Sequence, residues 1–194
     1  MPIEEDEHGT YILNSRDLRA IEHVARLVAI GVDSLKIEGR TKSPYYVARA
    51  SQGYRRAIDD ALAGRAFDTR LLGTLESLAN RGYTDGFYQR HHTPEHQNYL
   101  RGHSESGRSI LVGEAIGFDP GRNLVEVEVK NRFAVGDRLE FAQPGANPEM
   151  QVQRILDGQR GELSVVPGSG RRVWLDAPAD YDPAAPCFIA RFLD

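Results

Sequence analysis

The chain has 194 residues, of which 40% are hydrophobic and 27% charged, and this composition indicates a globular protein. No apolar run reaches the roughly 18 residues that a membrane-spanning helix needs, so we expect a soluble protein with no membrane partner. The net charge of −4 argues against a surface that binds nucleic acid over its whole extent. Cys187 is the only cysteine and no leader precedes the first predicted helix, so the sequence predicts a cytoplasmic location and no disulfide framework.

The first predicted βα unit lies at the start of the chain. Residues 10–13 form a short apolar run typical of a strand, and Asn14 or Ser15 can cap the helix that follows. Gly31 is predicted to end this helix. Its expected buried face contains Leu18, Ile21, Val24, Ala25 and Val28.

A second βα unit follows directly. A short buried strand is predicted over residues 32–37, and Gly39 ends it. Ser43 at the N-cap and Pro44 at the first helical position predict a helix that stops at Gly64. The apolar stripe of this helix consists of Val47, Ala50, Tyr54, Ala57, Ile58 and Ala61.

Two parallel strands alone would have open edges and apolar faces in contact with water, because a parallel sheet needs neighbouring strands and covered faces. We therefore interpret residues 1–90 as the closing βαβα segment of a TIM-like (β/α) barrel with an extra helix over residues 68–80. A doubly wound sheet is also compatible with the pattern, and a swapped or dimeric assembly through self-association of the exposed fragment is the alternative. The extra helix, capped by Asp68, is expected to bury Leu71, Leu72, Leu75 and Leu78.

The chain changes character after the third helix. Residues 91–109 are polar, contain four of the six histidines and predict a linker. His92 and His96 have a spacing that can bind metal on a helix, but Pro94 lies between them and no glutamate is adjacent, so we expect no metal site. From residue 110 to residue 194, seven short apolar runs separated by turn signals predict a small closed β-barrel. The whole chain is thus predicted to be α/β plus all-β.

Charged side chains gather at the end of the second predicted strand. Lys36, Glu38, Arg40 and Lys42 fall at or just beyond its C-terminal end, which is the edge where parallel α/β structures place functional groups. Between Lys36 and Arg65 the chain has seven basic and three acidic residues. This basic excess suits a phosphate or carboxylate ligand, and a solvated helix face is the alternative.

Three segments carry a resemblance to a known family: DEHGTYILNSRDLRAIEHV, GVDSLKIEGRTKSPYYVARASQGYRRAIDDALAG and LANRGYTDGF. They resemble the C-terminal half of the bacterial collagenase-like proteins of peptidase family U32, in the tRNA hydroxylation branch. The resemblance implies a (β/α)-barrel-like catalytic domain followed by a small β-barrel. It also implies prephenate-dependent 5-hydroxylation of the wobble uridine of tRNA, with an iron–sulfur cluster on cysteines upstream of the matched segment. One cysteine cannot supply the several thiolates of a cluster, so we expect this chain alone to be inactive.

The resemblance also suggests roles for the charged group. Lys36, Arg40 and Lys42 are placed to bind a dianion such as prephenate or a tRNA phosphate, and Arg40 suits this best because its planar fork can hold a carboxylate through two bonds. Glu38 would orient Arg40 or transfer a proton, which makes both residues catalytic candidates. An internal ion pair is the alternative of equal weight. Asn14, at the end of the preceding strand, is a further ligand-binding candidate.

Two other functions stay open. The family name implies a collagenase-like peptidase, although the sequence contains no nucleophile elbow or zinc motif, and Cys187 is interpreted as a buried strand residue. The other possibility is a non-enzymatic module that binds RNA or a partner. Arg171 and Arg172 are then the nucleic-acid-binding candidates, because they adjoin Trp174. The simpler interpretation places Trp174 in the barrel core and the arginines beside a turn.

Overall fold

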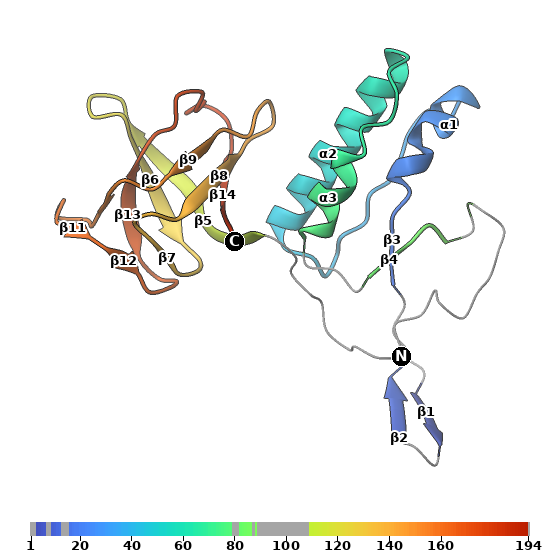
Figure 1. Cartoon of the computed structure of the whole chain (residues 1–194), viewed down its shortest axis with the longest axis horizontal. Coiled ribbons are helices and arrows are strands. Elements are labelled where there is room, and N and C mark those ends of the chain that lie inside the picture. Colours follow the sequence, from blue (N-terminus) through green and yellow to red (C-terminus); the bar gives the residue numbers. More distant parts are fainter. Residues whose placement is uncertain are drawn as a thin grey trace. The chain divides into compact units, whose positions relative to one another are not determined.

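The computed structural model describes residues 3–6, 9–12, 16–78, 82–86, 88 and 109–193, with side chains from residue 16 onward. The chain divides into two compact units, residues 1–107 and 108–194 (Figure 1). None of the described helices is long and apolar enough to cross a membrane.

The N-terminal unit begins with a hairpin. Strands β1 (Ile3–Asp6) and β2 (Gly9–Ile12) pair antiparallel, with Ile3 opposite Ile12. The prediction that residues 10–13 form a strand of a parallel sheet is therefore wrong in its pairing. The parallel pairing described in this unit joins β3 (Asp17–Leu18) to β4 (Tyr83–Thr84), and each of these strands has two residues.

The first helix begins later than the sequence predicts. A 3-10 turn, η1 (Ile21–His23), leads into α1 (Val24–Ala29), and Gly31 follows the helix with a positive φ of 83°. Ile21 and Val24 are buried as expected. Leu18 is 63% exposed, so its predicted place on the buried helix face is wrong. The reason is that pairing with β4 holds Leu18 in an extended strand.

The buried strand predicted over residues 32–37 is wrong. Residues 32–39 have no regular secondary structure, and Val32 and Ile37 are 40% and 38% exposed. A strand needs a hydrogen-bonded neighbour, and no described strand pairs with this segment. The described residues of the N-terminal unit thus form a mixed α and β structure, and their strand pairing does not confirm the predicted βαβα segment of a barrel.

Helix α2 (Pro44–Leu62) is confirmed together with its local signals. The Ser43 Oγ accepts a hydrogen bond from the Tyr46 backbone N–H at 3.1 Å, Pro44 is the first helical residue, and Gly64 follows with a positive φ of 67°. Ala50 and Ala57 lie on the buried face, but Val47 is exposed, contrary to prediction.

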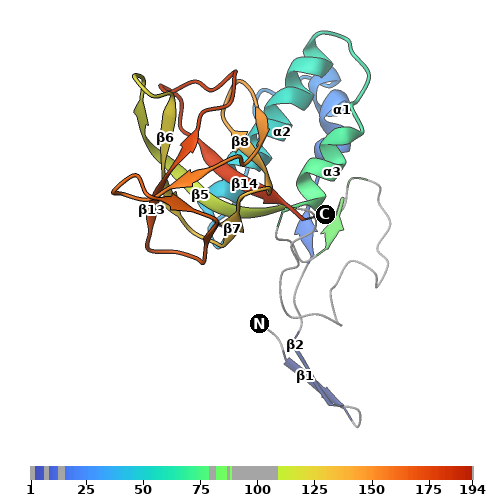
Figure 2. The same cartoon turned by 60° about the vertical axis from the view of Figure 1, so that its left-hand side comes forward.

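Helix α3 (Arg70–Glu76) is shorter than predicted, and it packs against α2 (Figure 2). A methyl group at Gly53 of α2 would lie at ordinary van der Waals distance from Leu75 (3.8 Å) and Ile21 (3.6 Å), so this face of α2 lies directly against both residues. The buried leucines of the α3 region are Leu71, Leu75 and Leu78, whereas Leu72 is half-buried.

The C-terminal unit is an antiparallel sheet in the order β11-β10-β13-β6-β5-β14-β8-β9. A separate pair, β7 with β12, accompanies it, and each of the seven predicted runs contains strand residues. The sheet curls strongly (Figure 2), but its end strands β11 and β9 do not pair with each other, so the prediction of a closed barrel is wrong. These end strands have only two and three residues. The strands are β5 (Ser109–Asp119), β6 (Leu124–Val129), β7 (Phe133–Ala134), β8 (Arg138–Ala142), β9 (Glu149–Gln151), β10 (Ile155–Leu156), β11 (Glu162–Leu163), β12 (Val165–Val166), β13 (Arg172–Asp176) and β14 (Phe188–Phe192).

Alternation along the strands builds the core of this unit. In β6, Val125, Val127 and Val129 are buried while the intervening glutamates are half-exposed, as the sequence predicts. In β13, Val173 and Leu175 are buried, so Trp174 points to the outer face and is only half-buried. The placement of Trp174 in the core is therefore wrong. The core consists of Val112, Val125, Val127, Val129, Phe133, Leu139, Phe141, Val152, Ile155, Val166, Val173, Leu175, Cys187 and Ile189.

Replacing Gly113 should destabilise the C-terminal unit. An alanine methyl group would overlap the Val127 side chain and approach the Glu128 carbonyl oxygen to 3.0 Å. We expect Gly113→Ala to lower the free energy of unfolding by about 1–3 kcal/mol, measured by guanidinium denaturation through the fluorescence of Trp174, the only tryptophan. Gly145→Ala is the control, because nothing lies within 4 Å of its added methyl group. Equal unfolding midpoints for the two variants would contradict the packing described for β5 and β6.

Candidate functional site

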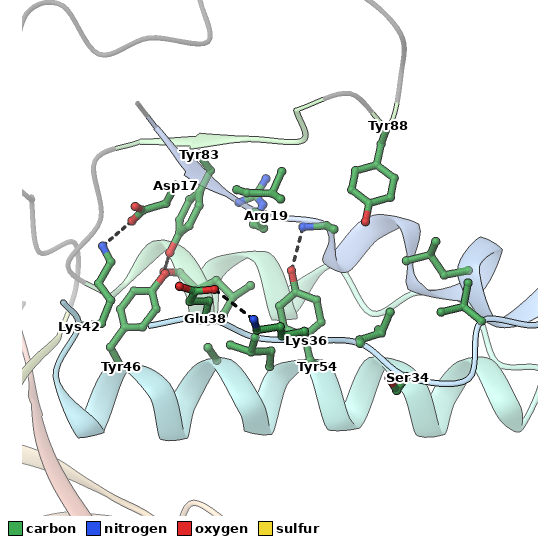
Figure 3. Close-up of a pocket in the computed structure, with 18 residues that line it drawn as sticks. Asp17, Arg19, Ser34, Lys36, Glu38, Lys42, Tyr46, Tyr54, Tyr83 and Tyr88 are labelled. Carbon is green, nitrogen blue, oxygen red and sulfur yellow. Dashed lines mark hydrogen bonds and ion pairs between the residues drawn. The ribbon is translucent and has the colours of Figure 1, made fainter. Parts of the chain in front are cut away.

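A cavity of about 560 Å³ lies within the N-terminal unit, between α2, the irregular segment 32–38 and strands β3 and β4 (Figure 3). Val32, Leu35 and Ile37 contribute apolar lining, so the residues predicted to form a buried strand instead form one wall of the cavity. The polar side chains that line it are Asp17, Arg19, Ser34, Lys36, Glu38, Lys42, Tyr46, Tyr54, Tyr83 and Tyr88.

An ion pair connects two walls of the cavity. The Lys42 Nζ lies 2.5 Å from the Asp17 Oδ2, and the side chains of Lys42 and Asp17 are only 15% and 16% exposed. The ammonium also lies 4.8 Å from the ring centroid of Tyr46, where the aromatic face attracts a cation. The pair holds the segment before α2 against β3. The sequence identified Lys42, but it missed Asp17 because residue 17 was placed in a helix.

Buried phenols add neutral hydrogen-bonding groups. Tyr46 and Tyr83 are hydrogen-bonded to each other, and burial raises the pKa of both. The Tyr83 hydroxyl donates to the Leu75 carbonyl oxygen at 2.8 Å, and the Tyr54 hydroxyl accepts from the Ala20 backbone N–H at 2.8 Å. Burial likewise raises the pKa of Tyr54. Sequence reasoning treated Tyr54 as part of an apolar stripe and therefore missed its hydroxyl as a polar group of the cavity.

The other predicted site residues lie at different places. Lys36 and Glu38 line the cavity, whereas Arg40 is not part of its lining and has an 85% exposed side chain. Glu38 binds both cations, through its Oε1 to the Arg40 Nε at 3.0 Å and its Oε2 to the Lys36 Nζ at 3.5 Å. The pair of Glu38 with Arg40 is thus exposed, where an ion pair contributes little stability. Asn14 lies outside the described residues.

The predicted nucleic-acid-binding residues of the C-terminal unit are both exposed. Arg172 lies opposite Glu128 in the pairing of β13 with β6, and the Arg171 carbonyl oxygen accepts a hydrogen bond from the Val129 backbone N–H at 2.9 Å. Trp174 lies two residues further along the same strand face as Arg172. The structure therefore places Arg172 and Trp174 on one outer face of the sheet.

The donor groups of this chain do not fit an iron–sulfur cluster. The one cysteine, Cys187, is 5% exposed within the core of the C-terminal unit, and a cluster needs several thiolates that can meet at one place. Within the described ranges no group of three or more histidine, cysteine, aspartate or glutamate residues could hold a metal ion. His92 and His96 lie outside those ranges.

Burial raises the pKa of the Cys187 thiol to about 12. We expect a disulfide exchange reagent at pH 8 to modify this thiol at least about tenfold more slowly in the native chain than in guanidinium, because the thiolate is scarce and the reagent is excluded. Rapid labelling of the native chain would contradict the burial of this side chain.

The same shift in pKa predicts how stability depends on pH. The folded-state pKa lies above the ordinary value of 9.0, so the contribution of Cys187 is complete below pH 9 and is lost as the pH rises toward 12. Cys187→Ala should therefore lose less stability than the wild type between pH 8.5 and about 11, measured by denaturant midpoints. Equal losses of stability in the wild type and Cys187→Ala over this pH range would contradict the raised pKa of Cys187.

Comparisons with known proteins agree with the division of the chain into two units. The model of Peptidase family U32 matches residues 2–98, and the model of Peptidase family U32 C-terminal domain matches residues 108–191. The chain is 54% identical over 178 residues to tRNA hydroxylation protein P of Escherichia coli and 51% identical to the protein of that name from Haemophilus influenzae. Each alignment covers 92% of this chain but 39% of the relative, so the chain spans about two fifths of the length of these relatives.

A solved structure is also similar to part of the chain. It is the C-terminal domain of a Geobacillus thermoleovorans protein of the U32 peptidase family, with 25% sequence identity and a TM-score of 0.38. The match covers 43% of this chain and 92% of that domain.

Proposed function

The chain belongs to peptidase family U32, and on this premise we propose that it is the C-terminal portion of a bacterial tRNA hydroxylation protein. The identity of 54% over 178 residues to tRNA hydroxylation protein P carries the proposal. The reaction is the prephenate-dependent 5-hydroxylation of the wobble uridine of tRNA, which takes place in the cytoplasm. Because the chain spans 39% of that relative, the complete protein is needed for activity.

In this proposal the N-terminal unit is the end of a (β/α) barrel that the rest of the protein completes. The exposed apolar side chains Leu18, Val32 and Ile37 support this, because neighbouring strands would cover them. The iron–sulfur cluster belongs to the part of the protein that supplies several cysteines, and it carries the redox chemistry there. This chain supplies groups that bind and orient the organic ligand.

The cavity of the N-terminal unit suits a dianion such as prephenate. Its lining contains three cationic side chains, Arg19, Lys36 and Lys42, and two carboxylates, Asp17 and Glu38, while Arg19 is also paired with Glu22 and Glu76 outside the lining. Lys42 is held in place before a ligand arrives, which lowers the entropic cost of binding. The Tyr54 hydroxyl accepts the Ala20 N–H and keeps its own proton available, so it can donate a hydrogen bond to a carboxylate oxygen (Figure 3). Arg40, held by Glu38 outside this lining, is placed to contact the tRNA phosphate.

Deleting the gene from its host should abolish 5-hydroxyuridine and its derivatives at the wobble position. Mass spectrometry of digested tRNA measures this, and the full-length gene on a plasmid should restore the modification. Normal hydroxylation in the deletion strain would overturn the proposed function.

Variants of the full-length gene test the proposed ligand groups. Lys42→Ala and Arg40→Ala should each lower the hydroxylated fraction about tenfold at limiting expression, since each removes a charge-assisted contact. Arg40→Lys should retain only part of the wild-type hydroxylated fraction, because an ammonium lacks the planar fork of a guanidinium. Arg55→Ala is the matched control: it breaks an exposed ion pair with Asp59 on α2, outside the cavity lining. Unchanged hydroxylation by soluble Lys42→Ala protein would remove this lysine from the site.

Peptidase activity is the alternative function, because the chain belongs to a family named for peptidases. Cys187 gives it no support, because a buried thiol with a raised pKa is a poor nucleophile. We expect the chain to leave gelatin uncut. Gelatin cleavage that survives repurification and disappears in a point mutant of this chain would restore the alternative.

A further inference from the structure

A second cavity, of about 440 Å³, lies in the C-terminal unit, and none of the predicted site residues lines it. Three arginines, Arg122, Arg154 and Arg160, line it together with one carboxylate, that of Glu162. Its apolar lining consists of the largely buried Leu124 and Leu156. From residue 110 onward the chain has nine basic and thirteen acidic residues, so the convergence of three cations does not reflect a generally basic surface.

Carboxylates outside the cavity lining orient the three guanidinium groups. Arg154 donates from its Nε and Nη2 to both oxygens of Asp176, with the Nη2 at 2.7 Å from the Oδ1. Asp119 accepts from the Arg122 Nη1 at 3.2 Å and from the Arg160 Nη2 at 3.4 Å. Each arginine is therefore fixed by a bond on one side and lines the cavity. Such pre-organisation lowers the cost of holding a ligand.

Arg160 is the most constrained of the three. Its φ of 67° lies in the left-handed region, which is unfavourable for a residue with a long side chain. The Asp157 carboxylate stabilises this turn by accepting the backbone N–H groups of Gln159 and Gly161, each at 2.8 Å. The strained turn directs the guanidinium over the ring of Trp174, 4.0 Å from its centroid.

In this arrangement one nitrogen of the Arg160 guanidinium has no hydrogen-bond acceptor among the described residues. This nitrogen is the Nη1, which is buried. Stacking on Trp174 uses the flat face of the guanidinium, whereas its N–H groups point outward in the plane and are suited to an oxygen ligand. A buried N–H without a partner is costly, and because the Nη1 is covered by neighbouring atoms, a ligand oxygen bonds to it only after a small movement of the Arg160 side chain.

We propose that this arginine cavity binds a backbone phosphate of RNA, as a contact with the tRNA substrate. The inference rests on the proposed function for the choice of RNA as the ligand. A phosphodiester offers oxygens that can accept from several guanidinium groups at once, and Leu124 and Leu156 suit the apolar face of an adjoining ribose. The contact is made by Arg122, Arg154 and Arg160, which differ from the Arg171 and Arg172 that the sequence singled out.

The test compares Arg160→Gln with Arg138→Gln in the 194-residue chain. Arg138 is a matched control, because it also stacks on a ring, that of Phe192 at 4.1 Å, and pairs with a carboxylate, that of Glu149 at 2.9 Å, but does not line the cavity. The probe is an unmodified tRNA transcript with a fluorescent end, followed by anisotropy at several salt concentrations. Guanidinium unfolding of each variant checks that it folds.

We expect Arg160→Gln to weaken tRNA binding about tenfold and to reduce the slope of log affinity against log salt by about one, while Arg138→Gln changes neither. Wild-type Trp174 fluorescence should change as tRNA binds, because the ligand contacts the arginine stacked on its ring. Absence of tRNA binding by the wild type, equal affinity of Arg160→Gln and wild type, or equal losses in both variants would overturn the inference.

A further comparison identifies the class of ligand. Polyglutamate at the same concentration of charge should not displace the tRNA, and displacement would assign the cavity to acidic protein segments and overturn the phosphate site. A different experiment tests the proposed function itself: normal wobble hydroxylation in the deletion strain would show that it is wrong. An Arg160-dependent RNA affinity in that case would support the phosphate site while the proposed function falls.

Discussion

The ion pair between Asp17 and Lys42 is the interaction on which the N-terminal unit most depends. It joins the two-residue strand β3 to the residues just before α2. Removing one partner would leave a charge in a largely buried place, and uncompensated buried charges are strongly destabilising. The same pair fixes the ammonium beside Tyr46, so the shape and the charge of the cavity have one physical origin.

The two units bury their apolar side chains to different degrees. The C-terminal sheet encloses a continuous core of fourteen buried residues, with Cys187 among them. In the N-terminal unit, Leu18, Ile30 and Leu62 are each more than 60% exposed, and the segment 32–39 has no strand partner among the described residues. This difference is the physical basis for proposing that further sequence completes the N-terminal unit in the whole protein. Self-association through the same surface stays a prediction.

Local signals were read correctly from the sequence because short-range physics determines them. Ser43, Pro44 and Gly64 define α2 through capping and backbone geometry, and alternation in β6 defines its buried face. Long-range pairing was not readable. The apolar residues 32–37 have the composition of a strand, but a strand forms only where a partner lies beside it. Asp17 was missed for the same reason, since its lysine partner is 25 residues away.

The candidate sites show the same limit. Lys36, Glu38 and Lys42 were found from their place after an apolar run, and the structure brings all three to one cavity, although Arg40 lies outside its lining. The cluster of Arg122, Arg154 and Arg160 could not be found, because its members come from separate turns and only the folded sheet brings them together.

In the proposed function, Lys42, held by Asp17, provides a cationic wall for a dianionic ligand of the complete protein. Calorimetric titration of prephenate into the purified full-length protein tests it most directly. We expect saturable binding by the wild type and at least about tenfold weaker binding by folded Lys42→Met, with the affinity of Arg55→Ala unchanged. Binding of equal affinity by the wild type and Lys42→Met would contradict it.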